Sequence, residues 1–248
     1  MSLDKNLFQQ LSNKLLAALP ASDYQRLVPH LKFVSLEVPQ MLYQAGEPIT
    51  HVYFADKSMV SIVTTMEDGS TAEVGIVSNE GMVGIPVILG NKATTTTSFV
   101  QISGAGMQMN ADVFRAEFNR GGAIQTLLLR YVQAIYSELS QTAACNRLHT
   151  LEERLARWLL TVSERLESED FPLTQEFIAQ MLGVRRSGVT VAASTLSRAG
   201  MISYHRGHIN ILNREDLEAT SCECYRVIQN EFARLLGMMP SKRSEKFF

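Results

Sequence analysis

The leucines near the N-terminus recur at helical steps. Between Asn6 and Leu19 one helical face carries Leu7, Leu11, Leu15, Leu16 and Leu19, which predicts a helix that ends before Pro20. Ser22 or Asp23 can cap a second short helix that continues through Leu31.

The pattern then changes to the alternation typical of strands. From Phe33 to Asn110, β-branched and aromatic residues alternate with polar ones, and glycines interrupt them at short intervals. His51–Phe54 and Met59–Thr65 are predicted strands, and Met66–Ser70 contains the Asp-Gly pair of a hairpin turn. Many short strands at this spacing indicate a small antiparallel barrel or sandwich.

Helical spacing returns at Ala111–Asn119, is interrupted by Gly121-Gly122, and resumes from Ala123 to about Arg147. In this long helix the apolar positions recur at steps of three or four residues, a narrow stripe that favours a coiled-coil seam between two chains over a core helix. The predicted dimer positions are Ile124, Leu128, Tyr131, Ile135 and Leu139. Leu151–Leu166 is a further amphipathic helix, and the acidic stretch Glu167–Asp170 with Pro172 predicts a surface loop.

The segment Leu173–Gly200 fits a helix-turn-helix. Thr174 can cap the first helix, and Gly183 can adopt the left-handed turn conformation without strain. Small or apolar residues are predicted to face the core, namely Ile178, Ala179, Leu182 and Val184 before or in the turn, and Val189, Ala192, Leu196 and Ala199 after it.

The outward face of the second helix has short side chains and no acid. We expect it to enter a major groove, with Arg186 as the candidate for a bidentate guanine contact and Thr190 and Val191 beside a thymine methyl. The strands on either side of Arg206-Gly207 are predicted to form a basic wing that contacts phosphate or the minor groove. The candidate DNA-binding residues are Thr174, Gln175, Arg185, Arg186, Ser187, Thr190, Val191, Ser194, Arg206 and His208.

Charge supports this interpretation locally, although the 248-residue chain has a net charge of −2. Phe177–Asn213 contains no Asp or Glu but several Arg and His, and a local positive field is what a polyanion-binding face requires. No apolar run approaches the roughly 20 residues that span a bilayer, and the N-terminus lacks a signal-peptide pattern, so we expect a cytoplasmic protein without a membrane partner.

In this order of segments the chain resembles the Crp/Fnr family of bacterial transcription regulators. The resemblance implies an α+β fold: an antiparallel β-roll (double-stranded β-helix) sensor like a cyclic nucleotide-binding domain, a long dimerisation helix and a winged helix-turn-helix. The corresponding bounds are 1–120 for the sensor, 121–148 for the helix, 149–216 for the DNA-binding domain and 217–248 for a C-terminal helical extension. It also implies a homodimer on a palindromic operator in double-stranded DNA, with RNA polymerase as a further candidate partner.

Two departures limit the resemblance. Family members that bind cyclic nucleotides hold the phosphate with a Gly-Glu pair and a later Arg, whereas this chain has Ile85 and a threonine run at those places. Without a guanidinium a buried phosphodiester would be costly, so we expect that cyclic AMP is not bound and leave the effector unknown. The candidate effector pocket comprises Gly81, Gly84, Ile85, Thr95, Thr96 and Thr97. On the recognition helix, Ser187 and Val191 replace a Glu and an Arg of well-known members, which predicts a different operator.

The cysteines predict neither a disulfide framework nor the four-cysteine iron–sulfur cluster of oxygen-sensing members, because only Cys145, Cys222 and Cys224 are present. Cys222 and Cys224 are expected on one helix, Arg214–Leu236, where positions two apart face different ways. We therefore assign no metal or cofactor, treat Cys145 near His149 as a less favoured thiol sensor, and, finding no catalytic motif, predict no enzyme.

The leading function is sequence-specific DNA binding that regulates transcription. Two alternatives remain: a ligand-binding signalling protein whose C-terminal domain contacts proteins, and a redox or metal sensor that uses the Cys pair. Salt dependence of binding to random DNA separates the first alternative from a regulator.

Overall fold

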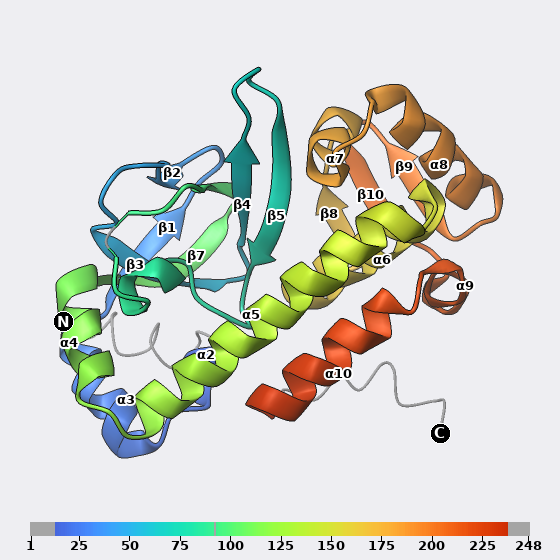
Figure 1. Ribbon diagram of the computed structural model, residues 1–248. Helices are drawn as coiled ribbons and strands as arrows, with labels where there is room; N and C mark the ends of the chain where they lie inside the picture. The colour runs from blue at the N-terminus through green and yellow to red at the C-terminus, as the bar shows by residue number, and fades with distance from the viewer. Residues whose placement is uncertain (1–12, 92, 238–248) are drawn as a thin grey trace. The chain divides into compact units, whose positions relative to one another are not determined.

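The computed structural model describes residues 13–91 and 93–237, which form two compact units (Figure 1). Within the described residues, one unit contains 13–62 and 76–133 and the other contains 63–75 and 134–237. The division falls inside one continuous helix, α5 (Ala123–Leu148), between Gln133 and Ala134. No helix in these described ranges is both long and apolar enough to cross a membrane.

Two sheets account for most of the first unit, although residues 63–75, which include the end of β4 and the start of β5, belong to the second unit. One sheet has the order β1-β7-β3 and the other β2-β6-β4-β5. The strands are β1 (Lys32–Leu36), β2 (Met41–Tyr43), β3 (His51–Asp56), β4 (Met59–Thr65), β5 (Thr71–Val77), β6 (Thr97–Ile102) and β7 (Gly104–Asn110). Met107 on β7 pairs with Phe33 on one side and Phe54 on the other, and Phe54 meets Phe114 edge to face at a ring distance of 5.8 Å. The expected α+β class and β-roll sensor are thus confirmed.

Short helices surround these sheets: α2 (Lys14–Ala17), α3 (Ala21–Leu27), the 3-10 helices η1 (Val28–His30) and η2 (Ile85–Ile88), and α4 (Ala111–Asn119). The helix expected over Asn6–Leu19 is seen only as α2, since residues 1–12 lie outside the described part. The predicted cap of the next helix is wrong: α3 begins at Ala21 after Pro20, so Ser22 and Asp23 lie in its first turn.

Gly121 and Gly122, both with φ of +80°, separate α4 from α5 as expected. Further along α5, Tyr131 is fully buried, and its hydroxyl accepts from Met82 N at 3.1 Å and lies 3.2 Å from Met82 O. The hydroxyl also lies 2.0 Å from where a Cβ on Gly81 would be. The residue at position 81 must therefore be glycine for this tyrosine to fit.

The second unit is built around α6 (Leu151–Leu166), which starts with a capping box of Thr150 and Glu153. It also contains α7 (Gln175–Leu182), α8 (Arg186–Arg198), α9 (Arg214–Thr220), α10 (Cys224–Leu236) and a sheet of order β8-β10-β9. The strands are β8 (Asp170–Pro172), β9 (Ile202–His205) and β10 (His208–Ile211). The predicted surface loop is wrong where β8 begins, because Phe171 is buried and pairs with Ile209.

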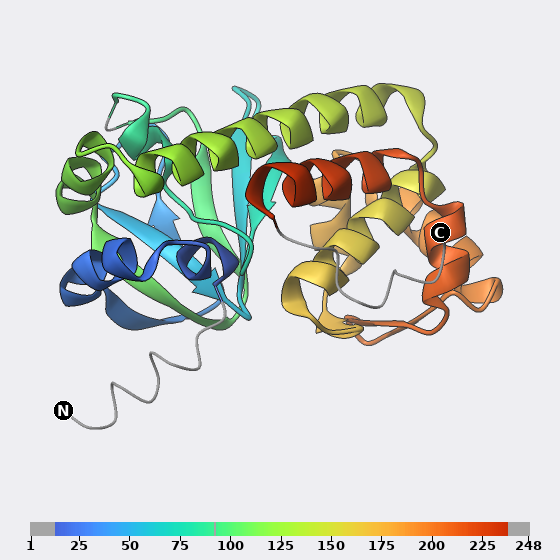
Figure 2. The ribbon, with the colours of Figure 1, turned by 90° about the horizontal axis from the view of Figure 1, so that it is seen from below.

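The single C-terminal helix expected over Arg214–Leu236 is also wrong. The chain leaves the helical conformation at Ser221, whose hydroxyl donates to Glu218 O at 2.8 Å and so satisfies a carbonyl at the end of α9. After this link, α10 runs beside the C-terminal half of α5 (Figure 2), with the Ser137 hydroxyl 3.3 Å from Glu231. A buried ion pair joins Arg165 of α6 to Glu138 of α5 at 2.8 Å.

Candidate nucleic-acid interface

The helix-turn-helix forms as the sequence predicts. The Thr174 hydroxyl accepts from Phe177 N at 3.2 Å and caps α7, and Gly183 follows that helix with φ of +62°. The core-facing residues are buried except two: Val184 is half-buried and Ala199 is exposed, because α8 has already ended at Arg198. The inward prediction for Ala199 is therefore wrong.

The two helices and α6 pack closely at the start of α8. A Cβ on Gly188 would lie 3.1 Å from the Leu151 side chain, so α8 crosses the first turn of α6 at short range. Val189, Ala192 and Leu196 then continue the contact and are buried. This packing fixes which face of α8 remains outside.

The outward face of α8 is accessible. Arg186, Ser187, Thr190, Val191 and Ser194 are all exposed, as is Arg185, which precedes the helix. The Thr190 hydroxyl donates to Gln175 Oε1 at 2.8 Å, so the face is ordered by a contact between α7 and α8.

Sequence reasoning missed Glu176. Its carboxylate lies 3.8 Å from the guanidinium of Arg186, and the two side chains are 78% and 68% exposed. The acid-free stretch Phe177–Asn213 begins one residue after Glu176. The charge pattern of the sequence therefore did not include Glu176 in the predicted DNA-binding face. The predicted helix-turn-helix could have indicated the contact between Glu176 and Arg186, because the first turn of α7 is adjacent to the first turn of α8.

The wing is a tight hairpin. Arg206 and Gly207 have φ of +48° and +78°, the two positive values of a type I′ turn. Gly207 O accepts from Leu173 N at 2.7 Å, which ties the hairpin tip to the start of the helix-turn-helix. Arg206 and His208 are exposed, and His208 Nδ1 lies 3.4 Å from the Asp170 carboxylate.

These elements enclose an open concavity of about 530 Å³. Four of the predicted DNA-binding residues line it, together with the acid and two wing residues that the prediction omitted: Thr174, Gln175, Arg186 and Arg206, with Glu176, Tyr204 and Gly207. The remaining predicted residues lie on the outward face of α8, at Arg185 before it, or at His208 on the wing.

The predicted dimer seam on α5 needs correction. Ile124, Leu128 and Tyr131 are buried inside their own chain and cannot contact a partner. Ile135 is half-buried, and Leu139 is exposed. The large apolar side chains that α5 does expose are Leu129, Tyr136, Leu139 and, at its last residue, Leu148.

The candidate effector residues lie on two segments. Gly81 and Gly84 are buried beside η2, with Gly84 at φ of +106°, and Ile85 is half-buried. Of the threonines, Thr95 is exposed while Thr96 and Thr97 are half-buried. Thr96 hydrogen-bonds Tyr43, whose burial raises the pKa of its phenol.

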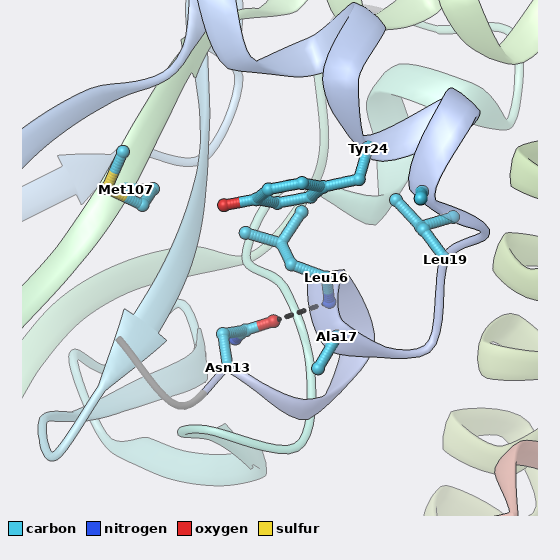
Figure 3. A pocket seen from close by; sticks show the side chains of 7 residues that line it. Asn13, Leu16, Ala17, Leu19, Tyr24 and Met107 are labelled. Atoms are coloured by element: carbon cyan, nitrogen blue, oxygen red, sulfur yellow. Dashed lines mark hydrogen bonds between the residues drawn. The ribbon is translucent and has the colours of Figure 1, made fainter. Parts of the chain in front are cut away.

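A cavity elsewhere in the first unit was not predicted. It has a volume of about 240 Å³ and lies between α2, α3 and β7 (Figure 3). Tyr24 extends over Leu16 towards Met107, and Asn13 accepts from Leu16 N at 3.0 Å at the base. The described residues that line it carry no charged side chain, so this lining suits an apolar group rather than a phosphate.

Three cysteines and a histidine meet in the second unit. Cys145 and His149, at the end of α5, lie with Cys222 and Cys224, and all four ligand atoms are within 4.8 Å of one another. The sequence interpretation separated Cys222 from Cys224 by placing both on one helix. The link between α9 and α10 overturns that interpretation.

Two family profiles match the sequence. The cyclic nucleotide-binding domain matches residues 33–120, and the Crp-like helix-turn-helix domain matches residues 153–220. No curated protein matches the sequence.

Solved structures share the fold. FixK2 from Bradyrhizobium japonicum is 17% identical with a TM-score of 0.68, over 77% of this chain and 98% of that one. The c-di-GMP responsive global regulator CLP from Xanthomonas campestris is 13% identical with a TM-score of 0.63, over 77% and 99%. A CRP-family transcriptional regulator from Thermus thermophilus is 18% identical with a TM-score of 0.63, over 77% and 96%.

Proposed function

The chain belongs to the Crp/Fnr family of transcription regulators, and we propose that it binds a palindromic operator as a homodimer, with α8 in the major groove and the wing on the phosphate backbone. Regulators of this family bind DNA through the helix-turn-helix.

The observation that carries the proposal is the outward face of α8. Its exposed side chains are short, except Arg186 in the first turn and Arg198 in the last, and none is acidic. A helix with this profile can approach base edges closely, and a guanidinium at its N-terminal end can donate two hydrogen bonds to guanine. Thr190 and Val191, one turn later, can contact a thymine methyl.

The wing supports the same placement. Arg206 lies in the hairpin turn and shares the open concavity with Arg186, so two cations face one surface. Phosphates on either side of a groove are spaced to meet such contacts, which position a protein without reading sequence. His208 adds a third group that can contact phosphate when its Asp170 partner is displaced.

Selection of bound duplexes from a random library, followed by a salt titration, tests the proposal. We expect a two-fold symmetric sequence with half-sites roughly 34 Å apart, and log K falling steeply with log salt. A flat salt dependence with no enriched sequence would support the protein-contact alternative instead.

Pairing of two chains is proposed along α5. Leu129, Val132, Tyr136 and Leu139 follow steps of three, four and three, the spacing of a coiled-coil seam. Leu129 and Tyr136 are 50% and 71% exposed, and apolar side chains exposed in one row favour contact with a second copy.

We also infer that cyclic AMP is not the effector. Ile85 and Thr95 supply neither the carboxylate nor the guanidinium that the family uses, so nothing at these positions neutralises a phosphate. Calorimetric titration of the dimer with cyclic AMP should show no saturable heat, and a stoichiometric isotherm would refute the inference. We propose that the protein acts in the cytoplasm. At promoters that the bound dimer activates, RNA polymerase is the proposed further partner.

A further inference from the structure

The cluster formed by Cys145, His149, Cys222 and Cys224 has no role in DNA binding as described above. Cys145 Sγ lies 3.5 Å from Cys222 Sγ, and Cys224 Sγ lies 3.5 Å from His149 Nδ1. The three thiols are buried, while the histidine side chain is 17% exposed and leaves a route for an ion to enter.

These separations fit one tetrahedral ion. With metal–sulfur bonds of about 2.3 Å and metal–nitrogen bonds of about 2.0–2.1 Å, ligand atoms around a tetrahedron lie roughly 3.5–3.8 Å apart. The Cys145–Cys222 and Cys224–His149 pairs are each at 3.5 Å, and no pair of ligand atoms exceeds 4.8 Å. The ligands of an iron–sulfur cluster are divided among two or four irons, and ligand atoms on different irons lie farther apart than this.

The surroundings match the outer shell of a metal-bound histidine. Nδ1 of His149 points to the thiols, and its Nε2 lies 3.2 Å from the Glu223 carboxylate. A carboxylate on the second ring nitrogen is the usual device that fixes the tautomer and orients a ligating imidazole. Gln141 Nε2 adds a donor at 3.1 Å from Cys224 Sγ, as expected for a sulfur that carries negative charge.

Charge around the cluster points the same way. Arg154 and Arg157 are 9% and 4% exposed, and the Nε of each has no hydrogen-bond partner among the residues that the structure describes. Both interact electrostatically with the Cys145 thiol. Buried guanidinium groups need a compensating anion. A divalent ion bound by three thiolates and a neutral imidazole has a net charge of −1 and supplies one.

We propose that Cys145, His149, Cys222 and Cys224 bind a single zinc ion in a closed tetrahedral site that joins the end of α5 to the link between α9 and α10. Four protein ligands leave no open position, so the ion has a structural role. Cys222 and Cys224 are separated by one residue, fewer than in common zinc motifs. Both thiols can reach one ion because Cys222 lies outside the helices.

Metal analysis of the full-length chain, purified under reducing conditions without added chelator, tests this proposal. We expect about one zinc per chain, and a tetrahedral cobalt spectrum with thiolate charge-transfer bands after exchange into Co²⁺. A strong chelator should remove the ion and lower the unfolding temperature, and zinc should restore it.

Variants separate a metal site from a group of buried thiols. Cys222→Ser and His149→Ala should lose the zinc, whereas His149→Cys should retain it because four thiolates also bind zinc. Glu223→Gln should weaken zinc affinity about 10- to 100-fold, with Glu215→Gln, an exposed acid on α9, as the unchanged control.

Two results would overturn the proposal. One is a correctly folded chain that contains no zinc and binds no Co²⁺ while all three thiols react with a thiol reagent. The other is a Cys145–Cys222 disulfide in protein purified without oxygen. Because metal content is measured without DNA, failure here leaves operator binding untouched, and failure of operator binding leaves the zinc site untouched.

Discussion

Arg186 lies 3.8 Å from Glu176 in the free chain, and both side chains are largely exposed. Exposed ion pairs contribute about 0–1 kcal/mol, whereas a bidentate guanine contact discriminates by about 1–3 kcal/mol. A base can therefore replace Glu176 as the partner of the guanidinium. In the proposed complex, Glu176 therefore competes only weakly with a base for the guanidinium of Arg186.

Arg186→Ala should weaken binding to the selected operator about 5- to 150-fold and relax the preference at one base pair in each half-site. Competition between operators that carry single substitutions measures both effects. Arg120→Ala is the matched control, since Arg120 is 62% exposed and lies 3.5 Å from Glu117. An equal loss for every sequence would show that Arg186 contacts only phosphate.

At the scale of elements, the wing depends on its two-residue turn. Gly207 has φ of +78°, a conformation that a β-branched residue adopts only with strain. The turn also holds Leu173 through the carbonyl of Gly207. The position of Arg206 therefore follows from the backbone of its neighbour.

Gly207→Val should cost about 1–2 kcal/mol through the left-handed conformation and displace the wing. We expect weaker binding to all duplexes with base preference retained, because the wing contacts the backbone. Filter binding to matched and mismatched operators checks this. Gly75→Val serves as control, since a Cβ there meets nothing within 4 Å. A change in base preference would contradict the assigned role of the wing.

Elements with a clear start and stop could be predicted from sequence. α4 and α6 have the expected bounds because Asn110 and Thr150 are good caps, and the wing turn follows from Arg206-Gly207. The break at Ser221 was missed because it arises from one side-chain hydrogen bond rather than from Gly or Pro. The cysteine cluster was missed for the same reason, since its ligands meet only across that break.

At the scale of the whole molecule, the faces of α5 illustrate a limit of periodicity. A stripe at steps of three and four shows that a helix has an apolar face, but not whether the same chain or a second copy covers it. The chain itself covers Ile124 and Leu128, whereas Leu129 and Tyr136 are exposed and belong to the proposed seam. The sequence alone therefore does not show which apolar positions of α5 the chain itself buries and which it exposes; the folded structure does.

Leu129→Glu should shift the dimer to monomer and weaken operator binding, because it places two carboxylates in the proposed seam. Leu148→Glu makes the same change at a residue 75% exposed and off the seam, and should leave the dimer intact. Sedimentation over a range of protein concentrations measures both. A Leu129→Glu variant that remains a dimer would place the interface elsewhere.

The contact between Tyr131 and the backbone of residues 81 and 82 restricts how this sequence can evolve. Any side chain at position 81 collides with the phenol, and loss of the phenol removes the partner of both Met82 backbone groups. A substitution at either position alone should therefore destabilise the fold. Related sequences should either keep both the glycine and the tyrosine or replace both. The two columns of an alignment should therefore covary.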